Sequence, residues 1–180
     1  MKNQNTKKLA YAALFLALCL VLPMLTGQIP QIGSMLLPMH IPVLLCGLVC
    51  GWQYGAAVGF VAPLLRSVLF GMPPMYPVAI AMAFELLTYG LVIGLVYRCL
   101  AQKGVAGVYA ALLTAMVAGR LVWGVAEVVL LGLGGKAFTA QAFLAGALLN
   151  AVPGIIVQLI LIPAVMAALQ KAGAVKQYAE

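Results

Sequence analysis

The strongest constraint on the fold of this chain is a series of long apolar runs that fills most of its 180 residues. Apolar residues make up 66% of the sequence and charged residues 7%, whereas a soluble domain averages about 25% charged residues. A helix that crosses a bilayer needs roughly 20 apolar residues. The sequence therefore predicts an all-α integral membrane protein with six transmembrane helices, forming one domain over residues 1–180 without a soluble part.

Turn residues set the bounds of the predicted spans. The expected spans cover residues 9–25, 35–51, 54–71, 76–97, 105–133 and 140–169. The last two are longer than a crossing requires, so we expect them to tilt, bend or project. The first apolar stretch lacks a small-residue cleavage site, and we interpret it as a retained span rather than a signal peptide.

The basic residues predict the orientation of the chain. An even number of spans places both termini on the same side of the membrane. If that side is the cytoplasm, Lys136 is the one basic loop residue on the outside. Basic residues concentrate in cytoplasmic loops of membrane proteins. The inner residues are then Lys2, Lys7, Lys8, Arg98, Lys103, Lys171 and Lys176. These residues are spread over several loops and form no stripe with aromatic residues, so no nucleic-acid partner is expected.

Polar residues within the predicted spans are candidates for a functional site. An ionisable group inside a membrane is costly, and it is a functional-site hypothesis by default. The depths expected from helical rise run from about 7 Å below the outer surface to the midplane. The inner half has almost no such residues, which favours a pocket open to the outside. The polar residues in the outer half or at the centre are His40, Arg66, Glu85, Arg120, Glu127 and Asn150.

Helical spacing adds two aromatic residues to the candidates and brings several of them together. Arg120 and Glu127 are seven residues apart and share a helix face with Trp123, while Tyr89 follows Glu85 by four residues. Arg120 and Glu127 are also about 10 Å apart along the axis, so each is expected to meet another span or to flank a bound molecule. The predicted substrate-binding residues are His40, Arg66, Glu85, Tyr89, Arg120, Trp123, Glu127 and Asn150.

Each of these residues also has a structural alternative. Arg66 can extend to the outer headgroups, and the two glutamates, Glu85 and Glu127, can form internal ion pairs with Arg66 or Arg120. His40, between two prolines, can be a hydrogen-bonded packing residue. Packing between helices is the alternative for Tyr89, Trp123 and Asn150.

The sequence offers no catalytic or nucleotide-binding motif. It has one histidine, no aspartate and no paired metal ligands of the HExxH kind. "GLGGKAF" fails the phosphate-loop pattern, because Leu130 stands at the first glycine position and Ala137 at the Ser/Thr position. We therefore expect no enzyme activity, no cofactor and no metal, and any ATPase must be a separate protein. The cysteines are expected to be inert apolar residues: Cys19, Cys46, Cys50 and Cys99.

Three segments together resemble the substrate-binding S components of energy-coupling-factor (ECF) transporters. "LPMHIPVLLCGLVCGWQYGAAVGFVAPLLRSVLFGMPP" is similar to their second and third spans, and "LLNAVPGIIVQLILIPAVMAALQKAG" to their last span. "AALFLA" supplies the small-xxx-small spacing of their first span through Ala13 and Ala17. The layout is nearest to the riboflavin/pantothenate-type subgroup.

The resemblance implies a specific function and specific partners. The chain would be the high-affinity substrate-binding subunit of an ATP-driven importer for a water-soluble vitamin or related precursor, in a prokaryotic plasma membrane. Its partners would be a transmembrane coupling subunit, which docks at Ala13 and Ala17, and two ATPase subunits. Nickel and cobalt relatives use an N-terminal histidine, whereas Lys2 and Asn3 stand here, so a metal substrate is not expected. With Arg66 in the outer half and Arg120 near the midplane, an anionic or carboxylate-bearing ligand is favoured, with neutralisation of both arginines by Glu85 and Glu127 as the alternative.

Two other classes of function remain open. A self-standing porter needs no ATPase partner, but it would carry polar groups along the full depth of the membrane. A scaffold for other membrane proteins would use its buried charges only as structural ion pairs.

Overall fold

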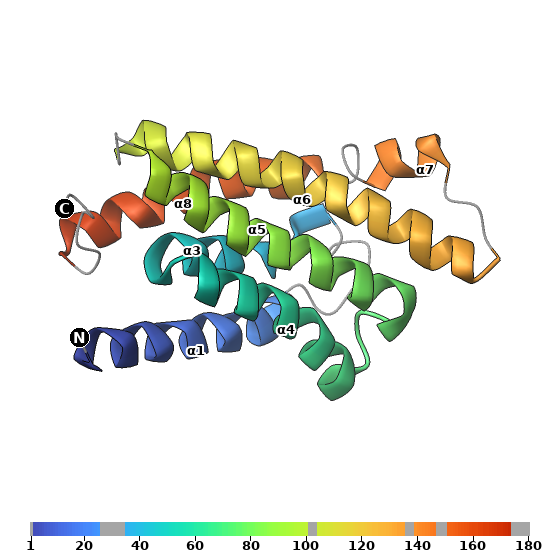
Figure 1. Ribbon diagram of the computed structural model, residues 1–180, viewed down its shortest axis with the longest axis horizontal. Coiled ribbons are helices and arrows are strands. Elements are labelled where there is room, and N and C mark those ends of the chain that lie inside the picture. Colours follow the sequence, from blue (N-terminus) through green and yellow to red (C-terminus); the bar gives the residue numbers. More distant parts are fainter. Residues whose placement is uncertain (1, 26–34, 101–103, 136–138, 147–150, 174–180) are drawn as a thin grey trace.

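The computed structural model describes residues 2–25, 35–100, 104–135, 139–146 and 151–173, and every element within these ranges is helical (Figure 1). Five membrane-length apolar helices confirm the predicted all-α membrane fold: residues 4–25, 52–70, 75–99, 105–133 and 152–171. The elements are α1 (Lys2–Leu25), α3 (His40–Cys50), α4 (Trp52–Phe70), the π-helical turn η1 (Met75–Ala79), α5 (Ile80–Cys99), α6 (Val105–Leu133), α7 (Ala140–Leu144) and α8 (Val152–Lys171).

Two apolar runs give helices that differ from the expected spans. The second run is broken after residue 36, and the 11-residue helix α3 begins at His40. Leu37 has a positive φ of 50° and precedes a proline, and both features are incompatible with a continuous helix from residue 35. The last run forms the short helix α7 and the longer helix α8, which begins at Val152 with proline in its first turn, where proline is well tolerated.

Helix α5 lies at the centre of the bundle, with α4 and α6 as its main neighbours (Figure 1). Helix α3 packs against α1, α4 and α5, and α8 packs against α6 and α3. Nine of the eleven residues of α3 are buried, so this short helix is enclosed by the others. The N-terminal end of α1 and the C-terminal end of α8 lie at the same end of the bundle, on the left in Figure 1.

Glycines allow α3, α4 and α5 to touch through their backbones. A Cβ atom on Gly59 would lie 2.2 Å from the Leu86 carbonyl oxygen, and one on Gly90 would lie 2.2 Å from the backbone of Gly55. A Cβ atom on Gly47 would lie 2.8 Å from the Gly90 carbonyl oxygen. Small residues at helix contacts permit this close approach in membranes, where apolar burial gives little drive for association.

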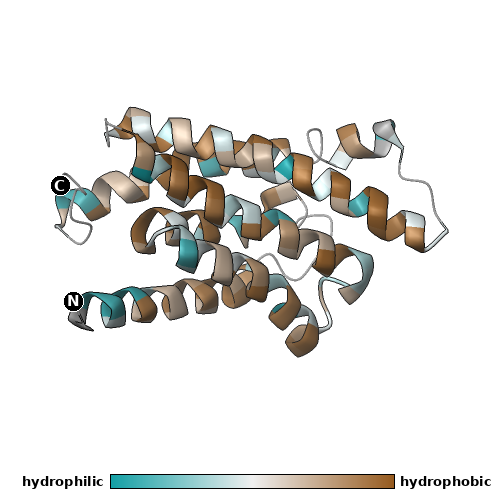
Figure 2. Cartoon of the chain, in the orientation of Figure 1, coloured by the Kyte–Doolittle hydropathy of each residue, from teal (hydrophilic) through white to brown (hydrophobic). Residues whose placement is uncertain are grey.

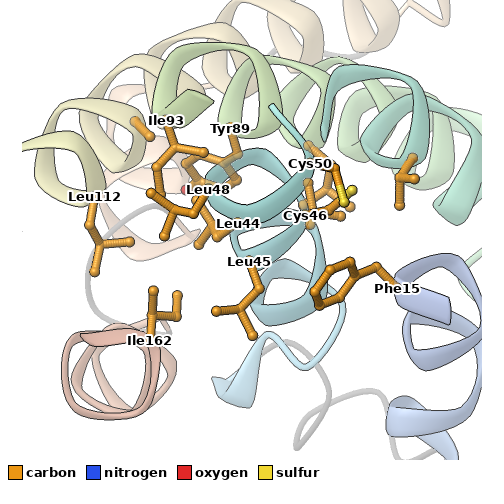
Figure 3. Packing of buried hydrophobic residues seen from close by; sticks show 14 of the residues in the cluster. Phe15, Leu44, Leu45, Cys46, Leu48, Cys50, Tyr89, Ile93, Leu112 and Ile162 are labelled. Atoms are coloured by element: carbon orange, nitrogen blue, oxygen red, sulfur yellow. The ribbon is translucent and has the colours of Figure 1, made fainter. Parts of the chain in front are cut away.

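The interior and the outer surface of the bundle are both apolar. Figure 3 shows the buried side chains that α3 shares with its neighbours, among them Leu44, Tyr89 and Leu112. The outside is apolar along the helix shafts in Figure 2, and Val117 and Ile160 are 62% and 67% exposed. A large exposed apolar surface is unfavourable in water but is the natural contact surface for lipid.

Candidate functional site

A buried polar cluster, formed by His40, Glu85, Tyr89 and Arg120, lies where α3 and α6 both approach α5. Arg120 Nη1 is 3.0 Å from Glu85 Oε1, and His40 Nε2 is 3.4 Å from the same oxygen. The side chains of His40 and Glu85 are 1% and 2% exposed. The Glu85 carboxylate therefore connects α3, α5 and α6. Its charge interactions are strong because water is excluded from its surroundings.

Tyr89 completes the polar cluster one helical turn after Glu85. Its hydroxyl interacts with the Glu85 carboxylate, and its ring meets the His40 ring edge-on at a centroid distance of 5.2 Å. The ring rests on Gly119 of α6, where a Cβ atom would lie 2.5 Å from it. Because Gly119 leaves room for the Tyr89 ring, Arg120 comes close enough to reach Glu85.

A second group of residues follows the polar cluster along α6. Arg120, Trp123, Gly124 and Glu127 recur at the spacing of one helix face, and we call them the α6 face. Arg120 Cζ lies 5.9 Å from the centre of the Trp123 ring. The Trp123 ring stacks on Phe143 of α7, with centroids 6.1 Å apart and an interplanar angle of 26°. The α6 face thus carries a cation, an aromatic stack and a carboxylate in sequence.

Glu127 differs from Glu85 in its partners. Its residue is only 6% exposed, and among the described residues no cation contacts its carboxylate. The negative charge of Glu85 repels this carboxylate. Arg120, in turn, has two buried nitrogens, Nε and Nη2, without a hydrogen-bond partner among the described atoms. The site therefore retains unused donors on Arg120 and a buried carboxylate, Glu127, that no described cation pairs with.

Arg66 lies apart from the polar cluster and has a different role in the bundle. Its Nη1 donates a hydrogen bond to the Leu20 carbonyl oxygen of α1 at 2.5 Å, and its Cζ lies 5.3 Å from the centre of the Phe70 ring. Its residue is 3% exposed, so protein encloses it. Of the two arginines proposed as partners of Glu85, Arg120 forms the pair and Arg66 joins α4 to α1.

The remaining predicted residues fall into two groups. Ala13 and Ala17 are exposed on the outer side of α1, whereas Ala12 and Phe15 of the same helix are buried. Asn150, predicted in the substrate site, and Lys136, predicted outside the membrane, lie beyond the described residues.

Sequence reasoning missed two residues that the structure brings to attention. Phe143 on α7 has no sequence feature that distinguishes it from other apolar residues, and only the structure places it on Trp123. Gln158 on α8 is 1% exposed, and its Nε2 has no partner among the described atoms. An amide in a transmembrane run is a recognisable polar signal, so Gln158 was detectable.

Comparisons with known proteins give one match. The family described as "ECF transporter, substrate-specific component" matches residues 7–166. No curated protein and no solved structure matches the chain. The matched range contains the polar cluster and the α6 face.

Proposed function

Because the chain belongs to the family of ECF transporter substrate-specific components, we propose that it is the high-affinity binding subunit of an ATP-driven importer for a water-soluble vitamin or related precursor. Members of this family bind a small-molecule substrate and work with ECF membrane and ATPase modules. The chain is thus a subunit of a transporter and not an enzyme. Its apolar helices make it a multi-pass protein of a prokaryotic plasma membrane.

The substrate site of our proposal combines the polar cluster with the α6 face. The observation that carries this assignment is the unused hydrogen-bonding capacity of Arg120 beside the buried Glu127 carboxylate, which has no paired cation among the described residues. Buried polar groups in proteins are normally satisfied. A small polar molecule between these residues would bond to the Arg120 nitrogens and reach Glu127, and Trp123 would contact its apolar part.

The remaining predicted residues have supporting roles in this proposal. Arg66 shapes the site indirectly by holding α1 against α4. Asn150 belongs to the site by its expected depth in the last apolar run. The layout of the sequence is nearest to that of the riboflavin/pantothenate-type carriers, a subgroup that includes carriers for several vitamins.

The partners in our proposal are a transmembrane coupling subunit and two ATPase subunits. The chain needs them because its one Gly-Lys pair lacks the phosphate-loop pattern. Ala13 and Ala17 support a docking face on α1, since both are exposed and lie one turn apart. Without a side chain larger than methyl, these positions let another helix approach closely.

The test is reconstitution into liposomes with and without the coupling subunit and ATPases. We expect the chain alone to retain the vitamin that co-purifies with it, identified by mass spectrometry, and to accumulate none. ATP-dependent accumulation should appear only with the complete module. Concentrative uptake by the chain alone would contradict the proposal and support the self-standing porter.

A further inference from the structure

We infer that the ligand of the α6 face carries a protonated amine or similar cationic group beside a flat aromatic ring, with Glu127 as its counter-ion. This inference rests on the proposed binding function and names the chemical class of the substrate at that same site. The inference follows from the charges that the protein itself neutralises and from the charge that it leaves without a counter-ion.

The charges of the polar cluster balance one another. Glu85 has Arg120 at 3.0 Å and His40 at 3.4 Å, so its carboxylate needs no further cation. Arg66 is held by the Leu20 carbonyl oxygen and the Phe70 ring, away from this cluster. The remaining charge on the α6 face is that of Glu127, which is buried and without a cation among the described residues.

A buried carboxylate without a counter-ion is unfavourable, because it has lost hydration and gained no compensating charge. Repulsion from Glu85 adds to this cost. A cation supplied by the ligand would remove both penalties and would form a charge-assisted hydrogen bond. An anionic ligand would instead face two carboxylates and only the unused nitrogens of an arginine that is already paired.

The aromatic part of the ligand is inferred from Trp123. This ring precedes Glu127 by four residues on the same face, which is about 6 Å along the helix axis. Its neighbour Phe143 makes the surroundings aromatic on a second side. A tryptophan face also attracts cations, so a ring with an amine one helical turn away fits both residues. The unused Arg120 nitrogens would donate hydrogen bonds to a neutral carbonyl or hydroxyl oxygen of the ligand.

The experiment compares three probes that share one ring and differ in charge: tryptamine, tryptophol and indole-3-acetate. Binding to the purified chain in detergent is measured by equilibrium dialysis. We expect tryptamine to bind about tenfold more tightly than tryptophol, as one charge-assisted hydrogen bond predicts. Indole-3-acetate should bind most weakly.

The Glu127→Gln variant tests whether this residue sets the preference. It should remove the difference between tryptamine and tryptophol while the unfolding temperature is retained. Glu180→Gln removes a carboxylate at the last residue of the chain and serves as the matched control, with the preference unchanged.

Three results would overturn the inference: equal or tighter binding of indole-3-acetate, a tryptamine preference that persists in Glu127→Gln, and no tryptamine binding at millimolar concentration. If ATP-dependent uptake by the complete module still occurs, only the ligand class is wrong. If that uptake is also absent, the proposed function fails with it.

Discussion

Arg66 and Arg120 are both arginines within apolar helices, yet their contacts differ. Arg120 meets a carboxylate, while Arg66 meets a backbone carbonyl oxygen and an aromatic ring. The sequence predicts how deep each arginine lies in the membrane, and on that basis both arginines were candidates for one site. The lateral position of each helix decides which residues meet, and helical spacing within a single run carries no information about it.

Replacing Arg66 tests its structural role. Arg66→Met keeps most of the side-chain volume but removes the hydrogen bond to Leu20, and a bond from a charged group is worth roughly 1.5 to 3 kcal/mol. We expect the free energy of unfolding in detergent to fall by that amount, with ligand affinity largely retained. Lost affinity at unchanged stability would instead place Arg66 in the substrate site, as its depth predicts.

The Glu85–Arg120 pair makes a second prediction at the scale of residues. Glu85→Ala leaves the Arg120 charge buried without its partner, and breaking a buried pair from one side costs about 3 to 5 kcal/mol. The double variant Glu85→Leu/Arg120→Met removes both charges, so we expect it to be more stable than Glu85→Ala alone. Urea unfolding of both variants measures the difference. If the double variant loses as much stability as the sum of the losses from removing each charge separately, the two residues are not coupled.

At the scale of elements, the sequence predicted the type of the long helices better than their number and their ends. Apolar length alone marks a membrane helix, and five long helices have it. The start of α3 depends on the backbone at Leu37, and the separation of α7 from α8 interrupts an apolar run. The spacing of Gly55 and Gly59, and of Gly90 and Gly94, was visible as a packing signal, but not which helices it joins.

Matched glycine variants test the backbone contacts. Gly90→Ala places a Cβ atom 2.2 Å from the backbone of Gly55, where neither helix can yield through a side chain. We expect a loss of at least 1 to 3 kcal/mol, roughly the usual cost of overpacking. Gly132→Ala on α6 meets nothing within 4 Å and should be neutral or stabilising by up to about 1 kcal/mol. Similar thermal unfolding of both variants would contradict the importance of this contact.

The exposed side of α1 is tested with a bulky side chain. Ala13→Trp or Ala17→Trp should block close approach of the coupling subunit, because both positions are exposed and small. Co-purification with the coupling module and uptake in cells should fall, while ligand binding by the chain alone persists. Tyr11→Trp, at another exposed position of α1, is the control and should change neither. Unchanged uptake in both alanine variants would exclude this docking face.

At the scale of the whole molecule, the start of α1 and the end of α8 lie at the same end of the bundle, which agrees with an even number of crossings (Figure 1). Membership of the family fixes transport as the process but not the substrate. The identity of the ligand depends on a few side chains whose meeting requires the folded structure. That is why composition and length could predict a membrane protein, whereas the balance of charges around Glu127 emerged only from its contacts.

The cytoplasmic location of the termini is still a prediction from the basic residues. A protease-sensitive tag at either terminus should be protected in intact cells and cleaved after permeabilisation. A reactive cysteine at Lys136, introduced into a variant whose four native cysteines are replaced by serine, should instead react with an impermeant reagent from outside. Cleavage of a terminal tag in intact cells would reverse the orientation, and with it the side from which the substrate enters.

The backbone contacts among α3, α4 and α5 have a mechanical consequence. Most helix pairs slide past each other by small side-chain rearrangements, which give the pair a soft shear coordinate. Where carbonyl oxygens and glycine Cα atoms meet directly, no rotamer is available to absorb such a shift. These three helices therefore change their tilt relative to the membrane normal together. When the protein reorients in the bilayer, α3, α4 and α5 turn as one rigid body. Any change in helix packing then takes place at the other helices.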